Sequence, residues 1–587
     1  MFTKCKGHLA ILLLLLVGAA IPARAQAPAP EDLSRGVARI SLMDGEVSVR
    51  RGDSGEWVAG VINAPLMTDD RIATGQNSRA EVQFDSANIL RIGGNAEIHL
   101  ALLENGRYHL EIAHGTVTYR MLRQTSADIE LNTPSVSARP AKLGSFRISV
   151  TEAGESEITA RLGDVEIFTP QGTQWVYDGQ TMMARGSMAD PEFQIVAASA
   201  LDDWDRWNEG RDRALDSNHS ARYVPEGVYG TEDLDAAGTW VYVAPYGYVW
   251  RPTAVAAGWA PYRNGRWVWV NWYGWTWVSY DAWGWAPYHY GRWFFDARWG
   301  WNWYPGGIGV RAYWSPALVG FFGYGGGGIG VGVGFGYGNI GWVPLAPYET
   351  FRPWWGAAYA GGLNRGVSIT SVNVTAVYRN ARATNGISGV STGEFTAGRF
   401  GDVQRLSGAQ VQTAGIVSGR LPLNPSMASR RFSDHAVTSI PRASSNTQFY
   451  SRSSGPVNAG TAAGNRTAPA LTGQSGYHRF GEPGAASLNS RPPQAAGSTA
   501  RQGSLQRFGE PSSGQAAPRN DRPSASQGGG WRSFGTPGAS TNGRQPSSQQ
   551  SRPGAVTNAP RSAPASSGRP APSGHVAAPK ADSKGHR

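Results

Sequence analysis

Apolar and polar positions alternate with a period of two through most of residues 37–172. The alternation is plain in ARISLMDGEVSVRR, RAEVQFDSANILRI, GRYHLEIAHGTVTYRM and SEITARLGDVEIFTP, and Gly, Asn or Asp interrupts it at short intervals. A period of two predicts strands that turn alternate side chains toward a core, and the interruptions predict hairpin turns. We therefore expect a mainly β protein that begins with a β-sandwich or β-solenoid, in which Gly45, Gly115 and Gly163 supply turn conformations.

The pattern changes between residues 197 and 221. Leu201, Trp204, Trp207 and Leu215 recur there at helical spacing, with charged residues between them. This spacing indicates an amphipathic helix. We expect a single linker helix whose aromatic face packs against a neighbouring domain.

The stretch from Trp240 to Trp355 holds 18 of the 23 tryptophans. In RWVWVNWYGWTWV, aromatic residues alternate with Val or Thr on both sides of a turn at residues 271–274, and GRWFFDARWGWNWYP repeats the arrangement. This pattern is typical of hairpins with aromatic side chains paired across strands. Gly and Pro occur too often for helices, so we expect a small β-domain of two or three hairpins over residues 223–425, with its core at 240–355.

The composition turns to glycine after residue 306. Glycine alternates with Val, Ile, Phe or Tyr as far as residue 342, which leaves one strand face bare so that a ring or another sheet can approach closely. From residue 426 to 587 the chain is rich in Ser, Gly, Pro, Ala, Gln and Arg, a composition that predicts a long disordered tail.

One short phrase recurs in this tail. It reads HRFGEP at residues 478–483, QRFGEP at 506–511 and WRSFGTP at 531–537. Spaced Arg and Phe residues suit weak multivalent contacts with an anionic polymer or surface. A solvated spacer with drifted repeats is the other interpretation.

The net charge of +11 is concentrated in the tail. From residue 428 onward there are 19 basic and 5 acidic residues, whereas the rest of the chain has 35 basic and 38 acidic residues. The positive charge therefore does not indicate a basic groove on the folded part, and we expect no nucleic-acid partner.

The N-terminus has the features of an export signal. Lys4 and Lys6 precede an apolar stretch at residues 9–21, and Ala23-Arg24-Ala25 follows as a small-x-small cleavage pattern. This predicts a Sec-type signal peptide over residues 1–25, whose removal takes away Cys5, the single cysteine. We expect a periplasmic, cell-surface or extracellular protein without disulfides and without a transmembrane segment in the mature chain.

Residues 37–172 resemble the FecR domain of bacterial envelope proteins. The resemblance lies in the repeated G-x-V strands, in DDRIATGQNSRAEVQF (69–84) and in NTPSVSARPAKLGSFRISV (132–150), where Gly144-Ser145 stands in place of the usual Gly-Thr pair. FecR regulators carry a cytoplasmic arm and a transmembrane helix before this domain. A signal peptide is expected here instead, so the resemblance implies the module and not anti-sigma signalling.

Residues 223–353 are similar to a Trp/Tyr-rich bacterial domain of unknown function. GWAPYRNGRW at 258–267, GWAPYHYGRW at 284–293 and the later GWVPLAPYE carry this similarity. It implies an envelope or secreted protein and brings no known activity.

No catalytic constellation can be identified. Asp281, Asp296 and Glu349 are the acidic residues between Trp240 and Trp355, and a glycosidase needs two carboxylates at a set separation. His289 is adjacent in sequence to two tyrosines and is expected on a hairpin surface rather than in an acid–base pair with Asp281. We expect no enzyme activity, no metal site and no cofactor.

The leading hypothesis is a non-enzymatic envelope protein that binds peptidoglycan or a polysaccharide through an exposed aromatic platform. Its expected ligand-binding residues are Trp267, Trp269, Trp275, Trp277 and Trp293, with Arg266 and Arg292 as hydrogen-bond donors or charges. Two alternatives stay open. One is a sensory or scaffold protein that binds an envelope protein through its FecR-like module, and the other is an aromatic cage for quaternary ammonium groups.

Overall fold

The computed structural model describes residues 35–187, 190–326, 336–356, 368–437, 448–449 and 476–480. The expected signal peptide and most of the expected disordered tail lie outside these residues. The described chain is mainly β, as the alternation predicts.

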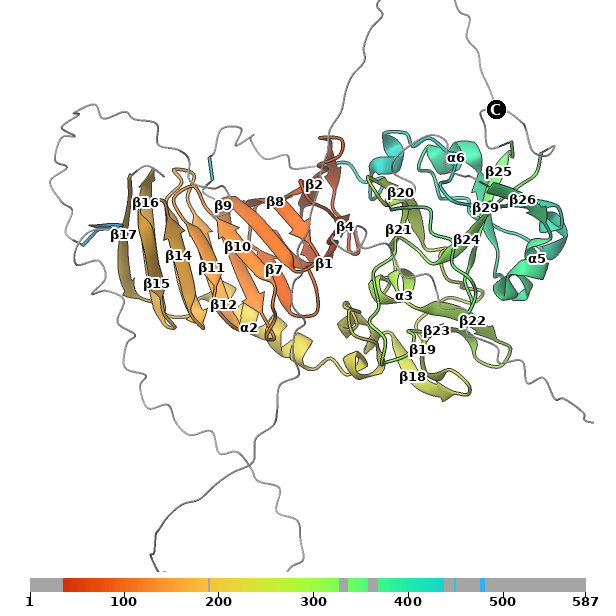
Figure 1. The fold of residues 1–587 in the computed structure, drawn as a ribbon, viewed down its shortest axis with the longest axis horizontal. Helices are drawn as coiled ribbons and strands as arrows, with labels where there is room; N and C mark the ends of the chain where they lie inside the picture. The colour runs from red at the N-terminus through yellow and green to blue at the C-terminus, as the bar shows by residue number, and fades with distance from the viewer. Residues whose placement is uncertain are drawn as a thin grey trace, which may run out of the picture. The chain divides into compact units, whose positions relative to one another are not determined.

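The first seventeen strands form two sheets that share one strand (Figure 1). The first sheet has the order β3-β2-β5-β8-β9-β10-β11-β14-β15. Its strands are β2 (Val47–Arg50), β3 (Trp57–Ala59), β5 (Arg71–Thr74), β8 (Glu97–Glu104), β9 (Arg107–Met121), β10 (Asp128–Asn132), β11 (Ser137–Pro140), β14 (Val165–Thr169) and β15 (Gly172–Val176).

The second sheet has the order β4-β1-β6-β7-β9-β12-β13-β16-β17-β30. Its other strands are β1 (Ala38–Asp44), β4 (Pro65–Leu66), β6 (Arg79–Gln83), β7 (Asn88–Ile92), β12 (Gly144–Val150), β13 (Ser156–Leu162), β16 (Gln180–Ser187), β17 (Asp190–Ala197) and β30 (His478–Arg479). The last strand of this sheet thus comes from the region expected to be disordered.

Strand β9 passes from the first sheet to the second at Gly115. Residues before Gly115 pair with β8, and residues from Gly115 onward pair with β12. Gly115 has φ +95°, and a Cβ there would lie 2.3 Å from the Cβ of Ala96. Only glycine fits this bend without strain, and Gly45 and Gly163 also have positive φ, so the expected role of all three glycines is confirmed.

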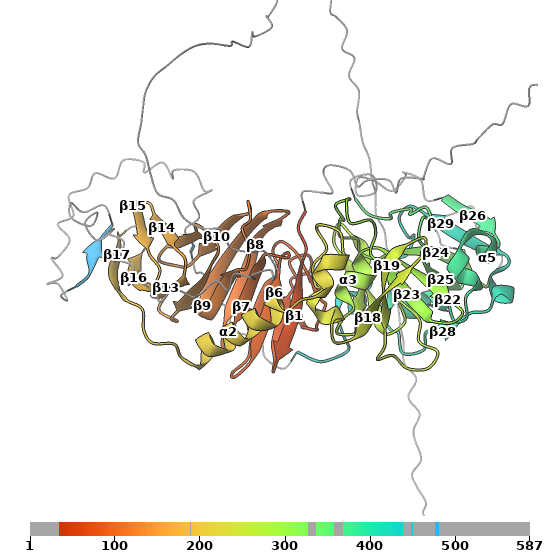
Figure 2. The ribbon, with the colours of Figure 1, turned by 90° about the horizontal axis from the view of Figure 1, so that it is seen from below.

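Helix α2 (Asp203–Asp216) lies on the outer face of the second sheet (Figure 2). The expected helix is confirmed, but it is shorter than 197–221 because Asp202 caps it with a reciprocal capping box. Trp204 donates a hydrogen bond to Thr118 at 2.9 Å, whereas Leu201 is exposed. The tryptophan and several ion pairs from the helix to arginines of the sheet attach the helix to the sheet. The face of the helix that contacts the sheet is therefore less apolar than the spacing indicates.

The Trp-rich part begins with short helices η1 (Ser220–Tyr223) and η2 (Glu232–Leu234) and continues as three hairpins. These are β18 (Gly238–Val243) with β19 (Gly247–Pro252), β20 (Gly265–Val270) with β21 (Gly274–Ser279), and β22 (Arg292–Asp296) with β23 (Gly300–Tyr304). The hairpin prediction is therefore confirmed, including the turn at 271–274. The second GWAPY repeat differs, because it forms the helical turn α3 (Trp285–His289).

A six-stranded sheet follows, with the order β26-β29-β24-β25-β27-β28. Its strands are β24 (Val319–Tyr324), β25 (Asn339–Pro344), β26 (Ser368–Val372), β27 (Ser388–Ser391), β28 (Gln404–Arg405) and β29 (Ala414–Ser418). The short helices of this region are α5 (Val374–Val377), η3 (Arg379–Arg382), α6 (Thr392–Thr396), η4 (Gly408–Val411) and η5 (Ala428–Arg430). A Cβ at Gly323 would lie 2.3 Å from the Tyr337 ring, and one at Gly341 would lie 2.3 Å from the Phe322 ring. The bare glycine face thus admits rings, as expected.

One continuous apolar core connects the two sheets to the Trp-rich part. Arg39 of β1 is fully buried and pairs with Glu232 at 2.6 Å and with Asp233 at 2.7 Å. The hydroxyl of Tyr229 donates to the carbonyl of Val37 at 2.6 Å. These contacts join the segments before and after α2 into a single packed structure.

The packed structure continues beyond residue 425, where the tail was expected to begin. Phe432 is fully buried, and its carbonyl accepts a hydrogen bond from Tyr280 at 3.3 Å. Arg51 donates to the carbonyl of Arg430 at 3.0 Å and lies over the Phe432 ring. Within the described residues, no helix has the length and apolar character needed to cross a membrane.

Candidate functional site

The hairpin β20–β21 brings together four of the tryptophans expected to bind a ligand. Trp267 faces Trp277 across the strands at a ring distance of 5.3 Å, and Trp269 faces Trp275 at 5.6 Å. The cross-strand pairing follows the sequence pattern. Their exposure does not, since Trp267, Trp275 and Trp277 are 0% exposed and Trp269 is 9% exposed.

Elements from later in the chain cover this hairpin. Phe321 of β24 packs on Trp267 at 4.8 Å, and Phe395 of α6 packs on Trp275 at 4.6 Å. The indole of Trp354 donates to the Trp275 carbonyl at 3.0 Å. The expected exposed platform is therefore wrong, because these rings have almost no free face on which a sugar or a quaternary ammonium group could stack.

Of the remaining predicted site residues, Trp293 and Arg266 are buried and Arg292 is partly exposed. Trp293 is 1% exposed, and its indole donates to the Pro287 carbonyl at 2.9 Å. Arg266 is 2% exposed and pairs with Asp434 at 2.9 Å. Arg292 donates to the Gly291 carbonyl at 2.8 Å, and burial lowers its pKa. Trp293 and Arg266 therefore belong to the packed interior and do not present a ligand surface.

His289 lies in the core and not on a hairpin surface. Its ring is fully buried next to Trp285 and Trp314, and its Nδ1 lies 2.8 Å from the Ser315 carbonyl. Burial lowers the pKa of His289 to about 3. Asp281 instead accepts hydrogen bonds from Asn264 and Tyr288, so the two residues do not form the acid–base pair considered from the sequence.

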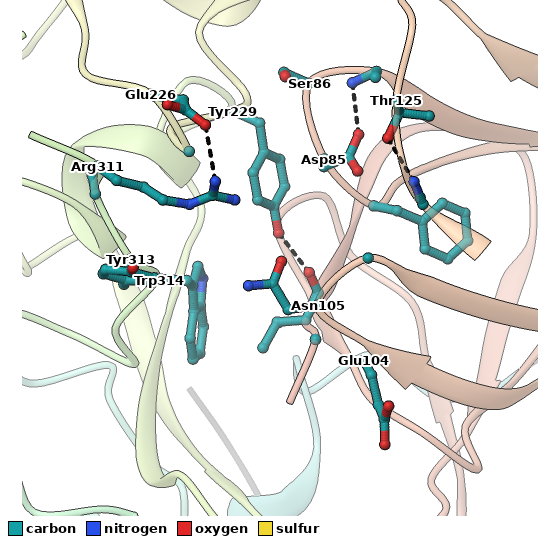
Figure 3. A pocket seen from close by; sticks show the side chains of 18 of the residues that line it. Asp85, Ser86, Glu104, Asn105, Thr125, Glu226, Tyr229, Arg311, Tyr313 and Trp314 are labelled. Carbon is teal, nitrogen blue, oxygen red and sulfur yellow. Dashed lines mark hydrogen bonds and ion pairs between the residues drawn. The ribbon is translucent and has the colours of Figure 1, made fainter. Parts of the chain in front are cut away.

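A cavity of about 430 Å³ lies between the first sheets and the Trp-rich part. We call it the junction pocket. Figure 3 shows Arg311, Tyr313 and Trp314 on one side of the junction pocket, and Asp85 and Thr125 on the other. Its walls therefore come from segments more than 180 residues apart in the sequence.

The charged lining of the junction pocket includes both signs. Its basic residues are Arg35, Arg123 and Arg311, and its acidic residues are Asp85, Glu104 and Glu226. Asp85 is held firmly, since it accepts hydrogen bonds from the Ala87 amide at 2.6 Å and the Tyr108 hydroxyl at 2.7 Å. Arg311 and Glu226 pair at 2.9 Å but are half or more exposed, so a ligand can exchange for this pair at little cost.

Aromatic rings complete the pocket wall. Tyr313 is 38% exposed, while Tyr229, Tyr290 and Tyr273 are nearly buried. Burial raises the pKa of Tyr229 and Tyr290 well above 10, so both hydroxyls stay protonated, and the Tyr229 hydroxyl already donates its proton to the Val37 carbonyl. The sequence does not predict this pocket, because no local pattern connects the strand ends near residue 85 with the loop at 311–314.

The described residues contain no group of three or more His, Cys, Asp or Glu side chains arranged to hold a metal ion. Chemically, the junction pocket can bind a ligand that carries both signs of charge and a flat apolar face. Residues for a cofactor are not evident in its lining.

Comparisons with known proteins separate the chain into two matched segments. The FecR protein family matches residues 70–166, and a family of unknown function, DUF6600, matches residues 231–349. A search of curated proteins finds none that matches.

A search of solved structures finds two crystal structures of a protein designated an anti-sigma factor from Parabacteroides distasonis ATCC 8503. They share 12% and 13% identity with this chain at a TM-score of 0.20, and the match covers 22% of this chain and 60% of theirs. A likeness this limited says nothing of what this chain does. From the two family matches, the chain carries a FecR domain over residues 70–166 and a DUF6600 domain over residues 231–349.

Proposed function

We propose that this chain is an exported, non-enzymatic binding protein of the cell envelope, and that its junction pocket holds a segment of peptidoglycan. The mixed lining of the junction pocket carries this proposal. An envelope location follows from the signal-peptide pattern at residues 1–25.

The size and the aromatic wall suit a sugar. A volume of about 430 Å³ falls within the range of roughly 300–1,000 Å³ typical of small-ligand sites. The half-exposed Tyr313 ring offers an apolar face to the C–H groups of a pyranose, and its hydroxyl offers a hydrogen bond.

The charges favour peptidoglycan over a neutral polysaccharide. Peptidoglycan joins sugars to short peptides that bear carboxylates and free amines. Arg35, Arg123 and Arg311 suit those carboxylates, and Glu104 and Glu226 suit the amines. A neutral glucan would leave these charges without counterparts, so they would favour neither its binding nor its orientation.

The test is a pull-down of the mature full-length chain on purified peptidoglycan and on an insoluble neutral polysaccharide. We expect binding to peptidoglycan, and we expect Tyr313→Ala/Arg311→Ala to weaken it about tenfold or more, as loss of a central contact does. Trp299→Ala is the matched control, because Trp299 is an exposed aromatic residue, 49% exposed, that does not line the junction pocket.

Two outcomes would contradict the proposal. One is a wild-type chain that fails to bind peptidoglycan, and the other is an equal loss in the Trp299→Ala control. Release of soluble fragments from the peptidoglycan during the assay would instead show that the chain is an enzyme.

Binding of a partner protein at the edge of the second sheet, whose inner strands include residues matched by the FecR family, is the second candidate function. It is favoured by the edge strand β17, which pairs with the two-residue strand β30 from far along the chain. Pairing of a peptide with a sheet edge is a general mode of protein recognition.

A further inference from the structure

The edge of the second sheet is occupied by a short segment of the region expected to be disordered. Glu192 and Phe193 of β17 pair antiparallel with Arg479 and His478 of β30 (Figure 1, where β30 is drawn in blue beside β17). An edge strand offers unpaired backbone groups to any extended peptide. Backbone pairing alone, however, does not select a sequence.

Side chains make this contact specific. Phe480 is 5% exposed and packs on Phe193 with ring centroids 4.4 Å apart. Arg479 reaches Asp190 at 3.3 Å. The Arg185 guanidinium lies 3.8 Å from the centre of the Tyr477 ring, which is a cation–π geometry.

The residues that make these contacts belong to the phrase that recurs in the sequence. Arg479 and Phe480 correspond to Arg507 and Phe508 in the second copy. The third copy keeps Phe534, and its Trp531 stands where the first copy has Tyr477, but Ser533 replaces Arg479 and the arginine lies one position earlier, at Arg532. The sequence therefore holds three copies of the phrase, whereas each chain has one β17.

We propose that the β17 edge is a recognition site for this phrase, whose shared part is Phe-Gly closely preceded by Arg, and that the phrases at 506–511 and 531–537 occupy it on neighbouring copies of the same chain. The phrase at residues 477–480 fills the site within its own chain. A surplus of phrases over sites turns the C-terminal region into a multivalent connector, because several weak contacts along one chain combine into a stable one. This inference is independent of what the junction pocket binds.

The recognition step is tested with a labelled peptide of residues 504–513 and the full-length chain carrying Arg479→Ser/Phe480→Ser. The peptide should bind this chain roughly tenfold or more tightly than it binds the wild type, whose own segment competes at high effective concentration. A peptide with Arg507→Ser and Phe508→Ser is the matched control and should lose this binding. Equal binding of the two peptides would overturn the proposal.

A charge reversal locates the site without touching the core. Asp190 is 58% exposed, so adding Asp190→Lys to the Arg479→Ser/Phe480→Ser chain, whose own segment no longer competes, should leave the fold intact while weakening the peptide several-fold. A peptide with Arg507→Glu should then recover binding to the Asp190→Lys chain. Unchanged binding in Asp190→Lys would place the peptide elsewhere and overturn the assignment to β17.

Sedimentation velocity of the full-length chain tests the link between copies. We expect association that rises with concentration and is lost in Phe508→Ser/Phe534→Ser, a variant that keeps the segment at 477–480. A wild-type chain that stays monomeric at all concentrations, or an association unaffected by this double substitution, would contradict the intermolecular role.

Discussion

Burial decides what each aromatic or ionisable side chain can do in this protein. Trp267 touches Phe321, Trp342 and Phe395, so it acts as the centre of an aromatic core. Aromatic pairs in such geometries add roughly 0.5–1.5 kcal/mol each beyond the apolar area that they bury. A Trp-rich sequence with few Leu or Ile residues thus obtains its core from rings.

The buried His289 predicts a loss of stability in mild acid. Burial lowers its pKa from 6.5 to about 3, so the unfolded chain binds a proton between these values and the folded chain does not. The free energy of unfolding should therefore fall as the pH drops below 6.5, by about 1.4 kcal/mol per pH unit from this group. His289→Gln should remove that component, which urea titrations at pH 7 and pH 5 would measure.

The matched control for this prediction is His435→Gln, since His435 is exposed. Its stability should change with pH as the wild type does. Comparing variants is necessary because Asp70 has the opposite effect. Burial raises its pKa to about 6, so its contribution falls as the pH rises from 3.8 toward 6. An equal pH dependence in wild type and His289→Gln would contradict the neutral buried histidine.

At the scale of single residues, the sequence predicts which tryptophans pair across a hairpin but not which distant residues bury them. The alternation in RWVWVNWYGWTWV correctly pairs Trp267 with Trp277, because a hairpin is a local structure. The rings that cover the pair come from Phe321 onward, and nothing local specifies which distant strand will lie on a given face. The prediction of an exposed platform rests on the hairpin contacts alone and leaves out the rings from distant segments that cover it.

Among the elements, helix α2 shows how ion pairs can replace an apolar face. Glu81 of β6 forms ion pairs with Arg91 at 2.9 Å and with Arg211 of the helix at 2.8 Å, and the Glu81 side chain is 1% exposed. Burial acts to raise the pKa of Glu81, but the two arginines outweigh it and hold the pKa at about 2. The carboxylate is thus charged at neutral pH and links the helix to the sheet.

Glu81→Gln should loosen this element. The substitution leaves Arg211 without a carboxylate, while Arg91 keeps Asp212 at 2.7 Å. Breaking a buried ion pair costs roughly 3–5 kcal/mol. We expect a lower urea midpoint and faster amide exchange in residues 203–216. Asp203→Asn on the same helix is the control, because its pair with Arg206 is solvent-exposed and should leave both readouts unchanged.

The same group predicts a second dependence on pH. Because the folded pKa of Glu81 lies below the ordinary 4.5, its contribution is present above pH 4.5 and is lost as the pH falls toward 2. Glu81→Gln should flatten stability over this interval. Protection of α2 that survives in Glu81→Gln would show that Trp204 and the capping box suffice to hold the helix.

The sequence predicts which helices and strands form better than it predicts which strands or core they pack against. The helical spacing around Trp204 and the strand alternation before residue 172 are both confirmed, since each is encoded within one turn or one hairpin. The strands β16 and β17, the helix α3 and the strand β30 were not anticipated. Their formation depends on an existing sheet or core, which supplies the pairing partner that the local pattern lacks.

For the whole molecule, Arg39 of β1 is the charged link between the two N-terminal sheets and the Trp-rich part. It is fully buried, whereas Glu232 and Asp233 remain partly exposed at 12% and 28%. Burial acts to lower the pKa of Arg39, but the two carboxylates raise it above its ordinary value. Arg39 and its two carboxylate partners therefore form a charged contact between two parts of a core that is otherwise apolar.

Arg39→Met should uncouple the two parts. It leaves Glu232, whose pKa burial already raises, without its cation, and removal of one member of a buried pair costs roughly 3–5 kcal/mol. We expect the wild type to unfold in one calorimetric transition because its core is continuous, and the variant to unfold in two. Arg107→Met, which breaks an exposed pair with Glu104, should cost less than about 1 kcal/mol and keep one transition.

A triple variant separates the charge from the packing in this link. Adding Glu232→Gln and Asp233→Asn to Arg39→Met removes the carboxylates that the single variant leaves unpaired, so it should recover much of the lost stability. Recovery together with a single transition would show that the apolar contacts around Tyr229 couple the two parts and that the ions only have to be balanced. Two transitions in the triple variant would show that the ion pairs themselves provide the coupling, and one transition in Arg39→Met would refute the coupling role of Arg39.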